Sequence, residues 1–129
     1  EFNSEKLQHS YRYLGEIPYQ DVQALMLGAQ AVLNPSFYEG WSTTVQEAKA
    51  FEKPLVLSDI EVHREQGVES TLYFDPHNPE SLLKALYKVS KIEVKPANVN
   101  QLHEQSIEQL RNVGNRFCEI ADMAIEDFQ

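Results

Sequence analysis

The sequence is poor in cysteine and in positive charge. Cys118 is the single cysteine among 129 residues, so an internal disulfide is excluded and nothing indicates an oxidising compartment. The 11 Lys and Arg residues are outnumbered by 20 Asp and Glu residues, which gives a formal charge of −9. Because binding to nucleic acid or to an anionic membrane needs a basic face, we expect neither.

Long apolar runs are also missing. No run approaches the roughly 20 residues that span a bilayer, and no signal-peptide pattern is present. We therefore predict no transmembrane segment and a cytoplasmic location. An apolar fraction of 42% and a charged fraction of 24% are ordinary for a soluble globular domain, and the length suits one domain.

The first residue is Glu1, so an initiator Met is absent. We interpret residues 1–10 as a polar lead-in or as a remnant of a cloning site. In either case we expect the chain to begin partway through a larger protein, as a single truncated domain over residues 1–129.

Short β-prone stretches alternate with helical patterns. Strands are predicted at Tyr11–Ile17, Ala31–Asn34, Pro54–Ser58 and Thr71–Phe74. Helices are predicted at Pro18–Gln30, at Ser42–Glu52, from His63 to Gly67, and after Asn78 and Pro79. With no hairpin signal, this alternation predicts an α/β fold, a Rossmann-like parallel sheet of at least four strands with flanking helices.

Two helical faces complete the expected fold. The helix after Pro79 is predicted to have one face formed by Leu82, Leu83, Leu86, Tyr87 and Ser90. Residues 91–97 are predicted to be a linker, with Pro96 as a breaker, and residues 98–128 a long C-terminal helix with an apolar stripe. Gly114 is the point where that helix is easiest to interrupt.

The stretch from Pro35 to Ala48, PSFYEGWSTTVQEA, is typical of a ligand-binding loop. Glu39 is expected in the loop at the carboxyl end of a strand, where open α/β sheets bind ligands, and Glu47 in the first turns of the next helix. Helical side chains tilt toward the helix N-terminus, so Glu47 should point back toward Glu39. We therefore expect two carboxylates to face one crevice.

The chemistry of this stretch favours a sugar joined to a diphosphate. Carboxylates repel phosphate but accept hydrogen bonds well from vicinal hydroxyls, as in sugar and ribose. Gly40 lets a backbone approach a ligand closely, and free N–H groups near Ser42, Thr43 and Thr44 favour an anion.

Each of these residues also has a structural alternative. Glu47 and Thr44 have the spacing of a capping box, as Gln46 and Thr43 do. Glu39 could be an ordinary exposed acid, and Trp41 either a wall of the site or a core anchor. A lone histidine such as His63 is more often a solvated surface residue than a ligand.

The same stretch resembles the Glu-x7-Glu signature of retaining GT-B glycosyltransferases of the family-four type, also called glycosyl transferases group 1. In that family an aromatic-Glu-Gly-aromatic turn precedes the helix that carries the second Glu. Further matching stretches are Lys53–Ile60, Val62–Glu65, Leu72–Pro76 and Asn78–Glu80. The resemblance runs from about Tyr13 to Val89, although Gly40–Thr44 differs from the Gly-Phe-Gly-Leu-Pro of many relatives.

The resemblance implies the C-terminal donor-binding domain of a glycosyltransferase. The expected substrates are a nucleotide-sugar donor and a glycan or lipid-linked acceptor, with no metal or other cofactor. The full-length protein would be cytoplasmic or peripheral at the inner face of the membrane. Glu39 and Glu47 would be the catalytic residues.

By the same resemblance, Glu39 would bind hydroxyls of the transferred sugar and Glu47 the ribose. Gly40, Trp41, Ser42, Thr43 and Thr44 would surround the donor sugar and phosphates, and Gly15 and Glu16 would approach the base. The family's phosphate-neutralising Arg and Lys lie on an earlier loop, and the acceptor side on a missing N-terminal domain. We therefore expect the isolated chain to be inactive.

Other functions fit the sequence less well. Asp59-Ile60-Glu61 is only a near match to a metal-binding Asp-x-Asp and is expected in a solvated loop, and no His or Cys spacing predicts zinc. A receiver-like signalling domain would need an acidic cluster, a phosphorylatable Asp and a late Lys that the chain does not offer. The alternative that stays open is a non-catalytic α/β interaction module that uses its C-terminal helix. Because truncation would uncover a strand edge, we also expect self-association.

Overall fold

The protein is described here by a computed structural model that covers residues 11–94 and 99–126. The predicted lead-in at 1–10, residues 95–97 of the predicted linker, and residues 98, 127 and 128 of the predicted C-terminal helix lie outside this range. No helix in the described ranges has both the length and the apolar character needed to cross a membrane.

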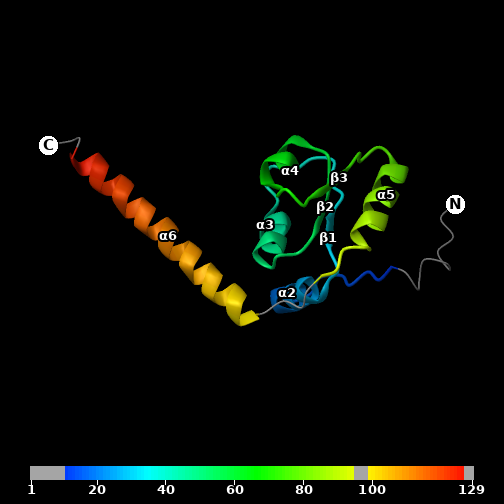
Figure 1. Ribbon diagram of the computed structural model, residues 1–129, viewed down its shortest axis with the longest axis horizontal. Helices are drawn as coiled ribbons and strands as arrows, with labels where there is room; N and C mark the ends of the chain where they lie inside the picture. Colours follow the sequence, from blue (N-terminus) through cyan, green and yellow to red (C-terminus); the bar gives the residue numbers. More distant parts are fainter. Residues whose placement is uncertain (1–10, 95–98, 127–129) are drawn as a thin grey trace.

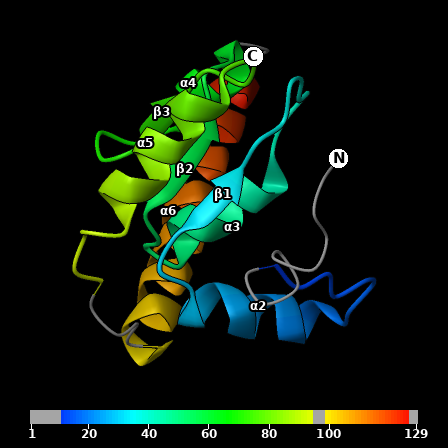
Figure 2. The ribbon, with the colours of Figure 1, turned by 90° about the vertical axis from the view of Figure 1, so that its right-hand side faces the viewer.

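The centre of the fold is a parallel sheet with the strand order β1-β2-β3. The strands are β1 (Val32–Asn34), β2 (Leu55–Ser58) and β3 (Leu72–Phe74). In the register, Leu33 lies opposite Val56, and Val56 lies opposite Leu72. Figure 2 shows the strands side by side with β1 at one edge. The predicted parallel α/β fold is confirmed, with three strands in the described residues.

The expected first strand is wrong. Residues 11–17 are not in a strand, and nearly all of them are exposed. β-Prone residues form a stable strand only when a neighbour completes the ladder and buries one face. In the described residues nothing pairs with this segment, so it remains an irregular arm ahead of the first described helix.

The helices follow the predicted order with small shifts at their ends. They are α2 (Tyr19–Gly28), α3 (Thr43–Ala50), α4 (Glu61–Gln66), α5 (Pro79–Val89) and α6 (Val99–Glu126). Pro18 occupies the N-cap of α2 rather than its first turn. Asn78 caps α5 as predicted, because its side chain accepts hydrogen bonds from the backbone N–H groups of Glu80 and Ser81.

Two apolar clusters cover the two faces of the sheet, as the alternation of side chains along a strand requires. Leu55 and Leu57 of β2 point to one face and pack with residues of α2 and α3; Val56 points to the other and packs with α5. Figure 1 shows α3 and α5 on opposite sides of the strands. The central strand β2 is therefore buried between helical layers, the arrangement expected for a parallel strand.

The predicted face of α5 reaches the core only in part. Ala85 and Val89 are the buried residues, and Leu82 of the predicted face packs beside them. Leu83 and Tyr87, which also belong to the predicted face, are 67% and 66% exposed. Two apolar stripes compete on this helix, and the small side chain of Ala85 lets the helix lie close to the sheet.

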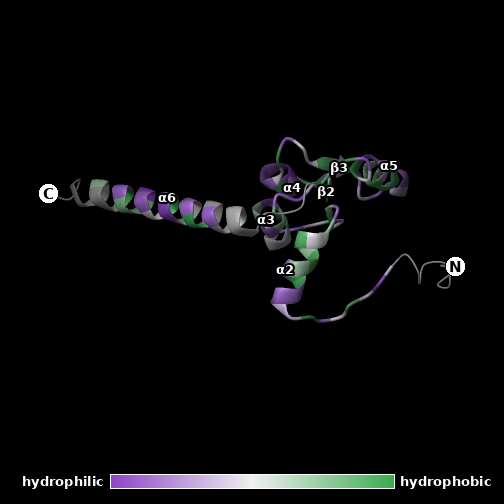
Figure 3. Ribbon diagram, turned by 60° about the horizontal axis from the view of Figure 1, so that its bottom comes forward, coloured by the Kyte–Doolittle hydropathy of each residue, from purple (hydrophilic) through white to green (hydrophobic). Residues whose placement is uncertain are grey.

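The C-terminal helix α6 is continuous over 28 residues, and Gly114 does not interrupt it. It extends away from the sheet in Figure 1, and Figure 3 shows that it carries both apolar and polar residues. Its described apolar side chains include Val113, Phe117, Ile120 and Met123, all of which are exposed. The predicted long helix is thus confirmed over Val99–Glu126.

Candidate functional site

The carboxyl ends of β1 and β2 carry buried polar residues. Asn34 ends β1 and Ser58 ends β2, and both side chains are buried. Parallel strands present their carboxyl ends at the same edge of a sheet, which is where such folds bind ligands. The chain that leaves β1 here is the predicted ligand-binding loop.

Asn34 and Ser36 hold the carboxylate of Glu39. Asn34 Nδ2 donates to Glu39 Oε1 at 3.2 Å, and the Ser36 hydroxyl lies 2.7 Å from the same oxygen. The Ser36 hydroxyl is also 2.8 Å from Asn34 Oδ1, which accepts the Ser36 backbone N–H as well. Since a hydroxyl has one proton, the carboxylate, as the charged acceptor, makes the stronger bond with it.

This environment favours the ionised form of Glu39. The hydrogen bond from Ser36 is the largest cause, and with the bond from Asn34 it lowers the pKa of the Glu39 carboxyl below its ordinary value despite partial desolvation. Hydrogen bonds to a carboxylate stabilise its charged form. An exposed loop acid is also ionised at neutral pH; what the bonds from Asn34 and Ser36 add is a fixed orientation of the Glu39 carboxylate.

A cavity of about 270 Å³ opens beside Glu39. It lies between the loop after β1 and the start of α4. Its lining residues are Phe37, Tyr38, Glu39, Gly40, Ile60, Glu61, Val62 and Glu65. Aromatic faces and hydrogen-bond acceptors of this kind can hold a polyhydroxylated ligand.

Gly40 leaves part of this cavity open. A Cβ at Gly40 would meet no protein atom within 4 Å, so the fold itself does not require glycine at this position. Gly40 lines the same cavity as Glu39. The missing side chain therefore gives space to a ligand beside the Glu39 carboxylate.

The start of α3 is fixed by Ser42 and Gln66. Ser42 is the N-cap, and its hydroxyl oxygen accepts the Val45 N–H at 3.4 Å and a bond from Asn34 Nδ2 at 2.9 Å. The Ser42 N–H donates to Gln66 Oε1 at 3.1 Å, and the Ser42 carbonyl accepts from Gln66 Nε2 at 3.0 Å. The N–H of Ser42, expected to be free for a phosphate, is therefore occupied.

Because Ser42 is the N-cap, the neighbouring threonines have other roles than predicted. The predicted capping boxes would start at Thr43 or Thr44, but both residues already lie in the helix. Within the described residues, the backbone N–H groups of Thr43 and Thr44 have no hydrogen-bond partner. They are the first unpaired donors of α3 and give its N-terminus a partial positive charge.

Glu47 does not cap α3. It lies beyond the third helical position, and its Oε1 accepts a hydrogen bond of 2.9 Å from the hydroxyl of Tyr19 on α2. This bond is the largest cause of a raised pKa of the Tyr19 phenol. Glu47 is also not among the residues that line the cavity beside Glu39. The two acids therefore occupy separate surroundings in this structure.

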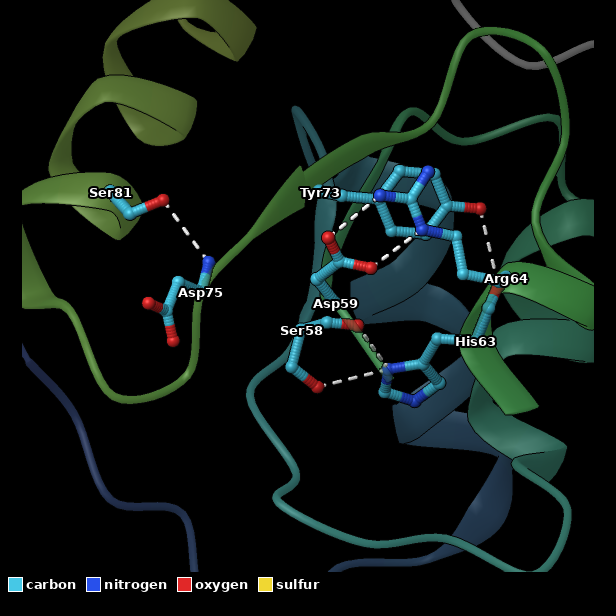
Figure 4. Close-up of polar contacts among 7 residues, drawn as sticks. All are labelled: Ser58, Asp59, His63, Arg64, Tyr73, Asp75 and Ser81. Carbon is cyan, nitrogen blue, oxygen red and sulfur yellow. Dashed lines mark hydrogen bonds and ion pairs between the residues drawn. The ribbon is translucent and has the colours of Figure 1, made fainter. Parts of the chain in front are cut away.

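His63 is buried instead of solvated. Its Nδ1 lies 3.0 Å from both the hydroxyl and the carbonyl oxygen of Ser58, as Figure 4 shows. The expectation of a surface histidine is wrong because α4 turns this side chain inward, toward the end of β2. Its Nε2 is buried without a hydrogen-bond partner among the described residues.

The two acids of the Asp59-Ile60-Glu61 stretch, the near match to a metal motif, have separate roles in the structure. Asp59 forms an ion pair with Arg64, with distances of 2.6 and 2.7 Å to its two oxygens. Glu61 opens α4. Within residues 11–94 and 99–126, no group of three or more His, Cys, Asp or Glu side chains could hold a metal ion.

The remaining candidates lie at the surface. Trp41 is 54% exposed, so it is not a core anchor, and it does not line the cavity beside Glu39. Gly15 has a left-handed backbone with φ 67° and lies with Glu16 in the exposed arm before α2. Neither Gly15 nor Glu16 lines that cavity.

Sequence reasoning missed Asn34, Ser36 and Gln66. The sequence predicts Asn34 only as the end of a strand, although a polar residue that closes a buried parallel strand is a usable signal. Ser36 stood in the predicted loop without a role. Gln66 gave no signal, because its contact with Ser42 joins segments 24 residues apart.

Comparison with known proteins agrees with this geometry. The family described as "Glycosyl transferases group 1" matches residues 2–110, which is most of the chain. The O-antigen chain mannosyltransferase RfbU of Salmonella typhimurium strain LT2 is 28% identical over 87 residues, covering 67% of this chain and 25% of that protein. The O-antigen chain mannosyltransferase B of Escherichia coli is 32% identical over 71 residues, covering 55% of this chain and 19% of that protein.

The chain thus spans a quarter or less of the length of these two relatives. No solved structure matches it significantly. The family match extends over the three strands, the loop that carries Glu39 and the helix that carries Glu47. The chain therefore belongs to the glycosyl transferases group 1 family.

Proposed function

We propose that this chain is the donor-binding part of an enzyme that transfers a sugar from a nucleotide sugar to an acceptor. The observation that carries the proposal is the Glu39 carboxylate, held by Asn34 and Ser36 at the carboxyl end of β1 and facing a cavity. Membership of the family supports sugar transfer as the reaction.

In this proposal Glu39 binds hydroxyls of the transferred sugar. Its fixed orientation reduces the entropy lost on binding, and its negative charge strengthens hydrogen bonds from sugar hydroxyls. Phe37 and Tyr38 supply apolar faces beside it. No Lys or Arg is among the described residues that line the cavity, which favours a neutral sugar over an anionic one.

The diphosphate is proposed to lie against the start of α3. The N–H groups of Thr43 and Thr44 are its donors, and Gly40 leaves room for the sugar beyond them. Ser42 contributes by fixing the helix start, since its own N–H donates to Gln66. Glu47 takes the ribose hydroxyls.

We infer a retaining reaction without a metal from the family resemblance. The bond from the anomeric carbon to the diphosphate breaks, and the acceptor oxygen bonds to that carbon on the same face. The departing diphosphate takes the acceptor's proton. Neutralising the diphosphate needs cations. Lys49 lies on α3, but its ammonium donates to the Gln66 carbonyl and is not directed at the proposed diphosphate site.

The relatives suggest a substrate class. Both are named as O-antigen chain mannosyltransferases, so we propose mannose or another neutral hexose as the donor sugar and a growing glycan, free or lipid-linked, as the acceptor. The intact enzyme would then act in the cytoplasm or at the inner face of the membrane. A second domain of the same protein would bind the acceptor, and the 129-residue chain alone would show no turnover.

The assignment of Glu47 can be tested by an amide-shift titration with UDP, GDP and ADP. We expect shifts that are confined to the loop and helix from Glu39 to Glu47 and are strongest for one nucleotide. Glu47→Ala should weaken that binding by about 1.5–3 kcal/mol, the range for hydrogen bonds to a charged group. The matched control is Glu69→Ala, because Glu69 is exposed in another loop.

If Glu47→Ala binds the nucleotide as tightly as the wild type does, Glu47 does not bind the ribose. If no nucleotide shifts any resonance, the same titration moves to the intact enzyme, and failure there would favour the second candidate function. That candidate is a non-catalytic interaction module, and the exposed apolar side chains of α6, such as Phe117, are the observation in its favour.

A further inference from the structure

The proposed binding of the nucleotide sugar does not yet explain the hydrogen bond between Tyr19 and Glu47. It links α2 to α3 across 28 residues of sequence, with a distance of 2.9 Å from the Tyr19 hydroxyl to Glu47 Oε1. Tyr19 is the first residue of α2 and is 55% exposed. A tyrosine at this exposed position is not needed to fill the core.

Packing of α2 determines where this tyrosine lies. Tyr19, Val22 and Met26 have the i, i+3, i+7 spacing of one helical face. Val22 and Met26 belong to the apolar cluster that includes Val45 and Ala48 of α3. Tyr19 therefore continues the face of α2 that packs toward α3, and it meets Glu47 one residue before Ala48.

The other end of α2 is fixed as well. The Lys53 ammonium donates to the carbonyl of Leu27 at 2.6 Å, and Lys53 is buried. With Met26 in the core and Leu27 bonded to Lys53, the helix cannot slide along α3 without breaking these contacts. The contact between Tyr19 and Glu47 is thus set by the fold.

The chemistry of a carboxylate leaves room for a second ligand. An ionised carboxylate has two oxygens and about four acceptor positions, and Tyr19 uses one of those on Oε1. A free Glu side chain loses rotamer freedom when it binds, whereas one already held by a neighbour loses less. A vicinal diol needs both of its hydroxyls to meet acceptors in fixed positions.

We propose that Tyr19 is a positioning residue that orients Glu47 for the ribose diol and so sets the preference for a ribonucleotide over its 2′-deoxy counterpart. This inference rests on the proposed binding of ribose by Glu47. A phenol is already protonated in the neutral pH range, and the hydrogen bond to Glu47 raises the pKa of Tyr19 further.

The test compares ribose and deoxyribose recognition in the intact enzyme. The affinities of UDP, GDP and ADP and of their 2′-deoxy forms are measured by calorimetry for the wild type, Tyr19→Phe and Glu47→Gln. Tyr19→Phe keeps the ring and removes only the donor. The matched control is Tyr87→Phe, since Tyr87 is 66% exposed on α5; circular dichroism and thermal melts verify folding.

We expect the wild type to prefer the ribonucleotide and Tyr19→Phe to reduce that preference about threefold to tenfold, the equivalent of one hydrogen bond. The loss should come mainly from weaker ribonucleotide binding, because the 2′-deoxy forms offer Glu47 one hydroxyl instead of two. Tyr87→Phe should keep the full preference.

Two results would overturn the inference, and they are distinguishable. If the wild type prefers ribose and Tyr19→Phe does so equally, Tyr19 does not position Glu47, while the ribose assignment stands. If the wild type shows no ribose preference, or Glu47→Gln retains it, the proposed role of Glu47 fails and the role of Tyr19 fails with it.

Discussion

Glu39 shows how one side chain is oriented by its immediate neighbours. Asn34 and Ser36 both approach Oε1 of its carboxylate. Ser36 in turn is connected to β2, because its carbonyl accepts a hydrogen bond from the hydroxyl of Ser58. The orientation of Glu39 therefore depends on the carboxyl ends of two neighbouring strands.

Removing the Ser36 hydroxyl should raise the pKa of Glu39. Ser36→Ala deletes the largest cause of the lowered pKa and leaves the bond from Asn34. The measurement is a pH titration of the Glu39 carboxyl carbon by NMR in both proteins. The control is Ser70→Ala, which makes the same change at an exposed serine in the loop before β3.

The same substitution should change how stability depends on pH. Because the pKa of Glu39 is lowered on folding, its hydrogen bonds stabilise the fold above the pKa of the unfolded chain, and this contribution is lost as pH falls through the folded pKa. The stability difference between Ser36→Ala and wild type should therefore be largest near neutral pH and shrink in acid. An unchanged Glu39 pKa would show that Ser36 does not hold the carboxylate.

At the scale of elements, α3 begins where side chains from other elements fix its first turn. Ser42 caps the helix, and Gln66 from the end of α4 bonds both the N–H and the carbonyl of Ser42. The N–H groups of Thr43 and Thr44, which have no partner among the described residues, follow directly. The position of α4 therefore controls where these donors point.

Gln66→Leu should destabilise the fold and loosen the start of α3. It leaves the buried N–H of Ser42 without its partner, while the Ser42 carbonyl keeps the bond from the Gln46 N–H. One unpaired buried donor costs about 1–3 kcal/mol, measurable as a lower free energy of unfolding in urea.

The control for this change is Gln20→Leu, because Gln20 is exposed on α2. We expect Gln20→Leu to stay within about 0.5 kcal/mol of the wild type. Equal stabilities for wild type and Gln66→Leu would contradict the role of Gln66 in holding Ser42.

At the scale of the whole molecule, two exposed features favour association between chains. β1 lies at the edge of the sheet, and Leu33 in its centre is 39% exposed. The helix α6 extends from the sheet (Figure 1), and its side chains Val113, Phe117 and Ile120 are exposed. Uncovered strand edges and unpaired apolar helix faces are both surfaces that proteins tend to bury.

We therefore predict that the 129-residue chain self-associates as its concentration rises. Light scattering should give a mass above that of one chain, and Phe117→Glu combined with Ile120→Glu should lower it if α6 is the contact. A mass that stays high in this variant would indicate that the chains associate through the edge of β1. A single-chain mass at high concentration would contradict the prediction.

The sequence by itself determined the order of elements and the identity of the loop. The short apolar run that ends at Ser58 favours a buried parallel strand, and Asn78-Pro79 caps and opens α5 through local chemistry. The family signature around Glu39 was visible for the same reason, since its parts are close together along the chain. Local patterns can be predicted because their physical causes are local.

Only the tertiary structure decided which contacts these residues make. The burial of His63, the pairing of Ser42 with Gln66 and the bond from Tyr19 to Glu47 each join separate elements. The stretch at residues 11–17 failed to become a strand because no described neighbour completes its ladder. Such outcomes depend on how helices pack on the sheet, and no spacing along the chain encodes that packing directly.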